Sequence, residues 1–345
     1  MTVNAHRGST VEERRSRRAG TESAIVLVVT MALLLSGCEG RQSALDPAGA
    51  EARELAGLFW MMTVSGGIIW TIFMAMLFYA LWLRPHAHEQ RTASRLVWIA
   101  GIAAPVVVLT TLLVYALPLM PALRQEASAF RIEVTGEQFW WRAQYRLPDG
   151  SSVTTANEIR MPVSEKIEIA LTSPDVIHSF WVPSLAGKMD MIPGRVNRLV
   201  LRPERTGTYR GACAELCGTS HALMAFDVHV MEAPAFAAWL DQQKRRARSP
   251  ETPEQQRGAT LFIETGCGAC HTIRGTAAAG TLGPDLTHVG SRTSLAAGQL
   301  PNNVGTMAGW IAGSQDLKPG NKMPLFNVLP GQDLRAVASY LTMLQ

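Results

Sequence analysis

The sequence is poor in charged residues and in histidine. Asp, Glu, Lys and Arg make up only 17% of the 345 residues, and the formal net charge is +4. So small and dispersed a charge excludes the basic footprint of a nucleic-acid-binding protein. The eight His residues are too few for a His-rich multinuclear copper centre. The chain is instead apolar, with 47% hydrophobic residues, and its few candidate metal-binding side chains are grouped in short segments.

Cysteine is also scarce, and its spacing argues against a disulfide framework. Cys213 and Cys217 form one close pair, Cys267 and Cys270 form another, and a His lies near each pair. Paired thiols beside an imidazole indicate cofactor ligation. The fifth cysteine, Cys38, has no such neighbour.

Charged side chains are entirely missing from two long apolar runs, residues 57–83 and 96–123. A membrane-spanning helix needs about 20 apolar residues, so both runs are predicted to span a membrane as a hairpin within residues 50–123. The intervening loop, residues 84–95, carries three Arg against one Glu. Positive loops stay on the cytoplasmic side, so everything after Leu123 is expected on the exported side.

The N-terminus has the features of an export signal. Arg residues at positions 14–18 precede an apolar run over residues 24–35, which is typical of a secretory signal peptide. Leu35-Ser36-Gly37-Cys38 also resembles a bacterial lipoprotein box, in which the Cys is acylated after cleavage. We expect residues 1–38 to be a signal peptide with a lipobox ending at Cys38. An ordinary signal peptide in which Cys38 is incidental is the alternative.

Apolar and polar residues alternate along several short segments after residue 124. Phe130, Ile132 and Val134 are the first such set, and the same alternation occurs at 167–169, 199–201 and 226–230. This period of two predicts half-buried strands and a compact, cupredoxin-like β-sandwich or barrel over residues 124–240. The polar, basic stretch 241–253 is predicted to be a linker that continues a helix begun near Pro234.

The loop from Cys213 to Met224 gathers soft metal donors. It contains Cys213, Cys217, His221 and Met224 within twelve residues, and His178 follows an earlier predicted strand. Sulfur donors mixed with imidazole favour copper over hard cations. One distant His with a clustered Cys, His and Met loop is typical of cupredoxin copper sites.

Cys267-Gly-Ala-Cys270-His271 is the attachment motif of c-type haem. The two thiols add to the haem and His271 becomes the proximal iron ligand. The second axial ligand is expected from Met307, Met323 or Met343. Met323 is favoured because it lies on an irregular loop ending at Pro324, whereas the other two lie in helical, core-like patterns. A thioether ligand raises the reduction potential. Residues 254–345 are predicted to form an all-α cytochrome c domain.

Three segments carry a resemblance to a known family. They are residues 175–183, residues 188–195 and the Cys213 to Met224 loop, in that order. Residues 50–232 resemble subunit II of cytochrome c oxidase, and residues 254–345 resemble a small class I cytochrome c. The implied fold is a multidomain membrane protein with a two-helix transmembrane hairpin, a cupredoxin-like β domain and an all-α cytochrome c domain.

The resemblance implies a binuclear copper A (CuA) centre. Cys213 and Cys217 would bridge two coppers, and His178 and His221 would bind one copper each. The weak ligands would be Met224 and the backbone carbonyl of Glu215. The Glu215 carboxylate would reach a magnesium site at the interface with subunit I. In the cytochrome part, the family implies Cys267, Cys270, His271 and Met323 as haem ligands, with the Pro284 backbone orienting His271.

The implied function is electron transfer. Electrons would come from cytochrome c or another periplasmic or membrane-bound donor. They would pass through haem c and CuA to haem a of subunit I, where oxygen is reduced to water and protons are translocated. Subunit III is a further expected partner. The chain lacks membrane helices with the His set for oxygen reduction, so it is expected to be one subunit of the enzyme, without catalytic residues. It would be a multi-pass protein of the bacterial inner membrane, with both redox domains on the periplasmic side.

Two positions depart from the family pattern. The family usually has Trp where this chain has Phe139, just before Trp140 and Trp141. That Trp takes up electrons from a docked soluble cytochrome c, and its replacement fits a donor that is tethered. Many members also have a Glu near the start of the second membrane helix, at a proton channel. Residues 95–123 contain no acidic residue, and Glu89 is the nearest.

Two alternatives use the same donor residues. A membrane-tethered copper-binding or assembly protein could use the loop after Cys213, although a copper carrier has no need of covalent haem. A copper reductase acting on nitrous oxide would need a second, His-rich copper site, which eight His residues cannot supply.

Overall fold

The computed structural model of the chain describes residues 39–83, 89–117 and 130–345. The predicted signal peptide and Cys38 lie outside these residues. So do residues 118–123, which form the end of the second predicted membrane helix.

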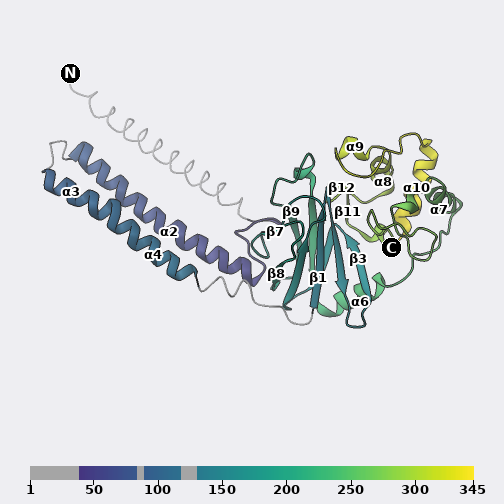
Figure 1. Ribbon diagram of the computed structural model, residues 1–345, viewed down its shortest axis with the longest axis horizontal. Coiled ribbons are helices and arrows are strands. Elements are labelled where there is room, and N and C mark those ends of the chain that lie inside the picture. Colours follow the sequence, from purple (N-terminus) through teal and green to yellow (C-terminus); the bar gives the residue numbers. More distant parts are fainter. Residues whose placement is uncertain (1–38, 84–88, 118–129) are drawn as a thin grey trace, which may run out of the picture.

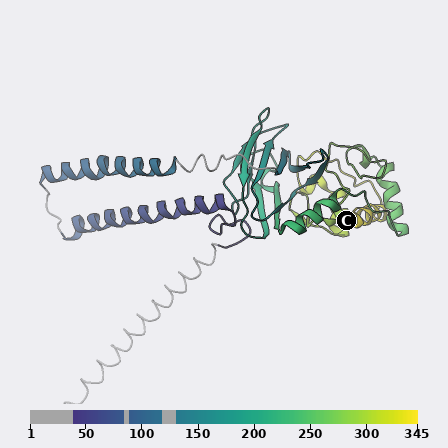
Figure 2. The same ribbon diagram turned by 90° about the horizontal axis from the view of Figure 1, so that it is seen from below.

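Two long helical spans precede the β-rich part of the chain. The first is α2 (Ala50–Phe78) with a π-helical turn (Tyr79–Leu83). The second is α3 (Gln90–Trp98), a π-helical turn (Ile99–Ala103) and α4 (Ala104–Ala116). Both spans are long and apolar enough to cross a membrane, and within the described residues their most apolar stretches are not buried. They project from one end of the molecule as a hairpin (Figures 1 and 2). A helix that is apolar on all sides is stable when lipid surrounds it.

Both spans begin several residues before the apolar runs that predicted them, and for α2 the reason is its contact with the β-rich part. The Ala52 amide donates to the Leu185 carbonyl at 3.2 Å, and the Glu51 carboxylate accepts from the Arg202 amide at 2.9 Å. A Cβ at Gly49 would lie only 2.4 Å from the Leu185 carbonyl oxygen. The first turn of α2 is therefore an anchor outside the apolar segment, which hydropathy alone does not detect.

The β-module, residues 130–231, consists of two five-stranded sheets. One has the order β3-β2-β1-β5-β8 and the other β4-β10-β9-β6-β7. The strands of the first sheet are β1 (Phe130–Glu137), β2 (Trp140–Arg146), β3 (Ser152–Ala156), β5 (Ile167–Thr172) and β8 (Asn197–Leu201). Those of the second are β4 (Glu158–Pro162), β6 (His178–Trp181), β7 (Met189–Met191), β9 (Gly207–Cys213) and β10 (Ala225–Met231).

The core of the β-module lies between the two sheets. Ile132 and Val134 on β1 are fully buried, as their alternation predicts. Trp141 of the first sheet is also fully buried, with its ring centroid 5.9 Å from that of Phe180 and 4.8 Å from that of Phe226, both in the second sheet. Aromatic packing of this kind joins the two layers close to the start of β6, where His178 lies.

A short connection joins the β-module to the C-terminal part. Helix α6 (Ala233–Gln243) ends at Gln243, and α7 (Pro253–Glu264) begins at Pro253, where Thr252 and Gln255 form a capping box. Pro253 therefore starts a helix, as its fixed φ permits. The connection is held to the C-terminal part, because the Ala247 amide donates to the Arg274 carbonyl at 2.9 Å.

The C-terminal module, residues 253–345, is mainly helical. Its elements are α7, α8 (Val304–Ala312), α9 (Ser314–Leu317), α10 (Gly331–Met343) and a two-residue ladder of β11 (Ser294–Leu295) with β12 (Leu300–Pro301). Helices α7 and α10 cross closely at Gly258, where a Cβ would lie 2.0 Å from the Ala336 carbonyl oxygen. The predicted fold class is therefore confirmed: a membrane hairpin, then a cupredoxin-like β domain, then a helical domain.

The C-terminal module packs on the end of the β-module away from the membrane hairpin (Figures 1 and 2). Two contacts illustrate the join. The Thr293 hydroxyl donates to the buried Glu158 carboxylate on β4 at 2.7 Å, and the Arg142 guanidinium on β2 donates to the Thr281 carbonyl at 3.1 Å.

Candidate metal centres

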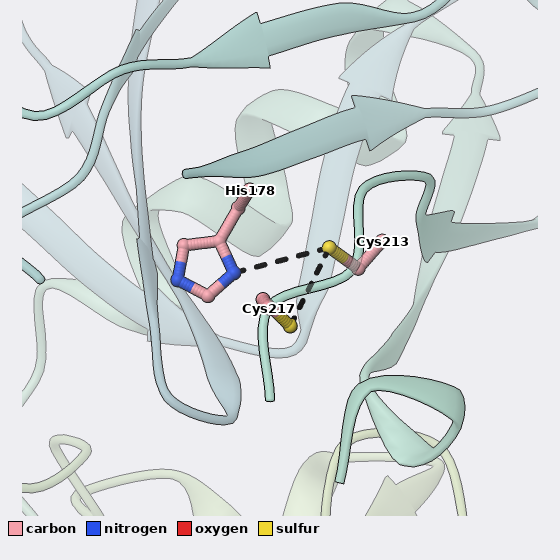
Figure 3. A group of neighbouring side chains, drawn as sticks. All are labelled: His178, Cys213 and Cys217. Atoms are coloured by element: carbon pink, nitrogen blue, oxygen red, sulfur yellow. Dashed lines mark hydrogen bonds between the residues drawn. The ribbon is translucent and has the colours of Figure 1, made fainter. Parts of the chain in front are cut away.

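The first site forms where two strands of one sheet end beside a loop. His178 is the first residue of β6, Cys213 is the last residue of β9, and residues 214–224 connect β9 to β10. Figure 3 shows His178, Cys213 and Cys217 pointing toward one another. Their ligand atoms all lie within 4.8 Å of one another, and all three residues are buried. This cluster forms although His178 is far from the other two in sequence.

All six residues predicted to ligate copper surround the same point. The Cys213 Sγ lies 3.8 Å from both His178 Nδ1 and Cys217 Sγ, and 3.2 Å from the Glu215 carbonyl oxygen. The Cys217 Sγ lies 3.6 Å from His221 Nδ1 and 3.8 Å from Met224 Sδ. Two thiols, two imidazoles, a thioether and a carbonyl therefore converge, which is a donor set suited to copper.

The surroundings keep His178 ready to bind a metal through Nδ1. Its Nε2 lies 3.0 Å from Asp175 Oδ1, and its ring packs on Gly136, where a Cβ would lie 3.0 Å from Cδ2. Burial by itself raises the pKa of Asp175, but hydrogen bonds from the Gln138 amide, from His178 and from the Val176 amide outweigh it and hold that pKa at about 2. The resulting carboxylate accepts the Nε2 proton, so Nδ1 is the ring nitrogen that faces the Cys213 sulfur.

The two thiols influence each other's protonation. Contact with Cys217 and His178 lowers the pKa of Cys213, despite burial, while contact with the Cys213 sulfur raises the pKa of Cys217. The contact between the two sulfurs therefore favours one thiolate in the pair, and the thiolate is the form that binds metal.

The Glu215 side chain lies at the surface of the β-module. Its carboxylate is half-exposed and lies 4.0 Å from the Lys188 ammonium, which is also 3.7 Å from Asp190. The carbonyl and the carboxylate of Glu215 thus face different surroundings. Its carboxylate is available at the surface of the β-module.

The second site is a cavity of about 380 Å³ between the β-module and the C-terminal module. From the C-terminal module it is lined by the predicted haem residues Cys267, Cys270, His271, Pro284 and Met323. Phe262, Leu286 and Leu341 add apolar surface, and Gln138, Phe139 and Trp140 approach from the β-module. An apolar cavity with two free thiols and an imidazole fits a covalently bound haem.

The orientation of His271 is set by neighbouring backbone. Its Nδ1 donates to the Pro284 carbonyl oxygen at 2.8 Å, which leaves Nε2 as the free ligand atom. Gly283 packs on the ring, where a Cβ would lie 2.5 Å from Cε1. Burial lowers the pKa of His271 and favours the neutral imidazole, which is the form that binds iron.

The three methionine candidates occupy different places. Met323 is half-buried and lines the cavity, and the buried Met307 lines it as well. Met343 packs against the hydrophobic core of the C-terminal module and does not line the cavity. The structure therefore reduces the candidates for the second ligand to two. Met323 lies on a loop and Met307 on α8.

The three consecutive aromatic residues divide between the two sites. Phe139 and Trp140 line the cavity, and Phe139 is only 4% exposed. Trp141 faces the core, with its ring centroid 6.3 Å from that of His178. The chain from residue 139 to 141 thus extends from the cavity to a predicted copper ligand.

Sequence reasoning assigned no role to several charged residues in these sites, among them Asp175 and Arg292. Asp175 stands three residues before His178 in one of the quoted motifs, and that spacing was an available signal. Arg292 lines the cavity and is half-buried, and desolvation lowers its pKa. No sequence signal marked Arg292, because its placement depends on contacts within the folded C-terminal module.

Comparison with known proteins gives consistent results for both modules. Residues 142–231 match the family model "Cytochrome C oxidase subunit II, periplasmic domain", and residues 255–345 match "Cytochrome c". Cytochrome c oxidase subunit 2 of Alkalihalophilus pseudofirmus is 31% identical over 94% of this chain and 98% of its own length. The Bacillus subtilis protein of that name is 30% identical over 92% of this chain and 96% of its own length. The solved periplasmic domain of subunit II of cytochrome oxidase from Bradyrhizobium japonicum is 33% identical, covers 35% of this chain and 96% of its own, and has a TM-score of 0.33.

These matches define a membrane protein that combines an oxidase-type periplasmic domain with a cytochrome c domain. The match to full-length relatives extends over almost the whole chain. The chain belongs to the cytochrome c oxidase subunit II family and is a subunit of an oxidase. The predicted identity as an oxidase subunit is thereby confirmed.

We predict that Gly283→Ala lowers haem incorporation, because the added methyl group would displace the His271 ring from the Pro284 carbonyl. Covalent haem per chain, measured from the pyridine haemochrome spectrum, should fall well below the wild-type value. Gly309→Ala is the matched control, since a Cβ there meets nothing within 4 Å. Wild-type haem content in Gly283→Ala would show that the ring tolerates the displacement.

Proposed function

We propose that this chain carries electrons into an oxidase, from a haem c in its cytochrome c module to a binuclear CuA centre in its β-module. From there electrons pass to haem a of subunit I, where oxygen is reduced to water and protons are translocated. The observation that supports this most strongly is the convergence of six donor groups around Cys213 and Cys217. A second support is the haem-type cavity beside that cluster.

In this proposal Cys213 and Cys217 hold two copper ions between them, and His178 and His221 each hold one. Met224 and the Glu215 carbonyl are the weak ligands. Bound copper supplies a one-electron carrier. The protein's part is to fix the donors and exclude water, and the burial of His178, both thiols and Met224 serves that purpose. Rigid, buried donors limit rearrangement when the charge on the metal changes.

In the cytochrome c module, Cys267 and Cys270 would attach the haem, and His271 and Met323 would be its axial ligands. The haem supplies the first one-electron carrier. Pro284 has a positioning role, since its carbonyl holds His271 with Nε2 toward the cavity. Phe139, Trp140 and Trp141 would lie along the electron path, because they extend from the cavity to His178.

The donor is proposed to be cytochrome c or another periplasmic or membrane-bound carrier, and the partners to be subunits I and III. The half-exposed Glu215 carboxylate is proposed to reach a magnesium ion at the interface with subunit I. The protein would lie in the bacterial inner membrane with its redox domains, residues 124–240 and 254–345, on the periplasmic side, joined by the linker 241–253.

We further propose an acylated Cys38 after signal-peptide cleavage. Mass spectrometry of the mature N-terminus tests this, and an unmodified Cys38 would exclude it.

We predict that Cys217→Ser abolishes the copper signal and preserves the haem. The substitution removes a bridging thiolate, so the mixed-valence EPR signal of two coupled coppers should be lost while the reduced haem α band stays. Cys267→Ser is the reciprocal control, because it should impair haem attachment and leave the copper signal. A persistent two-copper signal in Cys217→Ser, or zinc in place of copper in the wild type, would contradict the proposal.

We predict that Met323→Ala removes the weak near-infrared band of the iron–thioether bond. Met307→Leu is the matched control, because Met307 lines the same cavity from α8. It should keep the band. The opposite pattern, with the band retained in Met323→Ala and lost in Met307→Leu, would assign the ligand to Met307.

A further inference from the structure

A buried lysine lies where the cytochrome c module (residues 253–345) meets the copper loop (residues 214–224, between β9 and β10). Lys318 follows α9 directly and is only 2% exposed. Its Nζ donates to the Leu223 carbonyl at 2.9 Å and to the Ala296 carbonyl at 3.1 Å. Within residues 39–83, 89–117 and 130–345, no ion pair with a carboxylate is found for it. Lysine is almost never fully buried without such a partner, so this placement calls for a specific role.

The Lys318 side chain contacts the copper loop between two proposed ligands. Leu223 is the last residue of a short 3-10 turn, His221–Leu223, and Met224 follows it directly. The Leu223 carbonyl also accepts a hydrogen bond from the Gln299 side chain at 3.3 Å. A shift of Leu223 would therefore move the backbone that carries both His221 and Met224.

The same lysine is rigidly joined to the loop that carries Met323. Asn321 connects the two ends of this loop, because its side-chain amide donates to the Lys318 carbonyl at 2.7 Å and its side-chain oxygen accepts from the Met323 amide at 2.8 Å. Ser314 on α9 adds a bond to the Met323 carbonyl at 3.0 Å. Lys318 and Met323 thus belong to one segment, residues 318–323, whose conformation is fixed by these hydrogen bonds.

Two further bonds join the same segments. The Ser220 hydroxyl, fully buried, donates to the Pro319 carbonyl at 2.6 Å. The Ala225 amide, directly after Met224, donates to the Ala297 carbonyl at 3.2 Å. Together with Lys318, these bonds connect the copper loop to the cytochrome c module on both sides of Leu223.

We infer that Lys318 is a positioning residue for electron transfer between the two redox centres of this chain. It holds the loop of His221 and Met224 at a fixed separation from the loop of Met323. The inference rests on the proposed function. Burial lowers the pKa of Lys318 to about 7, and both protonation states of a primary amine have enough N–H groups to serve two carbonyls. Fixed separation matters because electron tunnelling slows steeply as the distance between centres grows.

The test compares the fully loaded chain with Lys318→Met, which keeps the length of the side chain and removes its donors. Pulsed EPR measures the distance distribution between oxidised haem and copper, and flash reduction of the haem measures the rate of copper reduction. We expect a broader distribution in the variant and transfer slower by several-fold, because electron tunnelling slows steeply with the distance between the two centres. The copper EPR and haem absorption spectra should stay those of the wild type. Lys244→Met is the matched control, because Lys244 is exposed and pairs with Asp241, and it should match the wild type in both measurements.

A wild-type distance distribution and transfer rate in Lys318→Met would overturn the inference. If the wild type itself shows no transfer from haem to copper, the proposed function fails instead. Ser220→Ala, which removes only the bond to Pro319, decides the matter if Lys318→Met does not assemble. A broadened distribution in Ser220→Ala supports the fixed contact between the loops, and an unchanged one argues against it.

Discussion

The loop between β9 and β10 contacts both the start of β6 and the cytochrome c module. On one side its thiols, imidazole and thioether meet His178 at the start of β6. On the other side its backbone is held by the cytochrome c module through Lys318, Ser220 and Ala225. Because both sets of contacts act on the same few residues, the geometry of the donor cluster and the docking of the cytochrome c module depend on each other. The core of the β-module and the hydrogen bonds within the loop before Met323 hold both sets of contacts in place.

The position of Phe139 follows from that docking. The sequence resemblance implied a Trp at this position, and this chain has a Phe that is almost fully buried and lines the cavity between the modules. Gly218 of the copper loop and Gly320 of the cytochrome c module both approach its ring, since a Cβ at these positions would lie 3.1 Å and 3.5 Å from it. The attached cytochrome c module thus covers this position. A linker also raises the effective concentration of the donor module to about the millimolar range.

Much of this organisation could be predicted from short-range patterns. The metal-donor motifs depend on residue type and close spacing, and the alternation at Ile132 and Val134 depends on the side-chain period of a strand. The length of the apolar runs predicted both membrane helices. It did not predict the first turn of α2, which contacts the β-module, because that turn contains charged residues such as Glu51. His178 was linked to the loop by the pattern of one distant His with a clustered Cys, His and Met loop, and the family resemblance implied the same ligand.

The residues that sequence reasoning missed owe their roles to long-range contacts. Lys318 looked like an ordinary polar residue in a loop, and only its contacts with Leu223 and Ala296 show it to be buried between modules. Arg292 is similar, since it reaches the cavity from a segment without a motif. The choice between Met323 and Met307 also exceeds what pattern can decide, because both side chains line one cavity.

In the proposed function, donor and acceptor are parts of one chain and exchange electrons within it. The most direct test reduces the haem of the loaded chain with a light flash and follows copper reduction over about a hundredfold range of protein concentration. Transfer between tethered modules is first order, so its rate should be independent of dilution. A rate that falls in proportion to protein concentration would show that electrons pass between different molecules and would contradict the account.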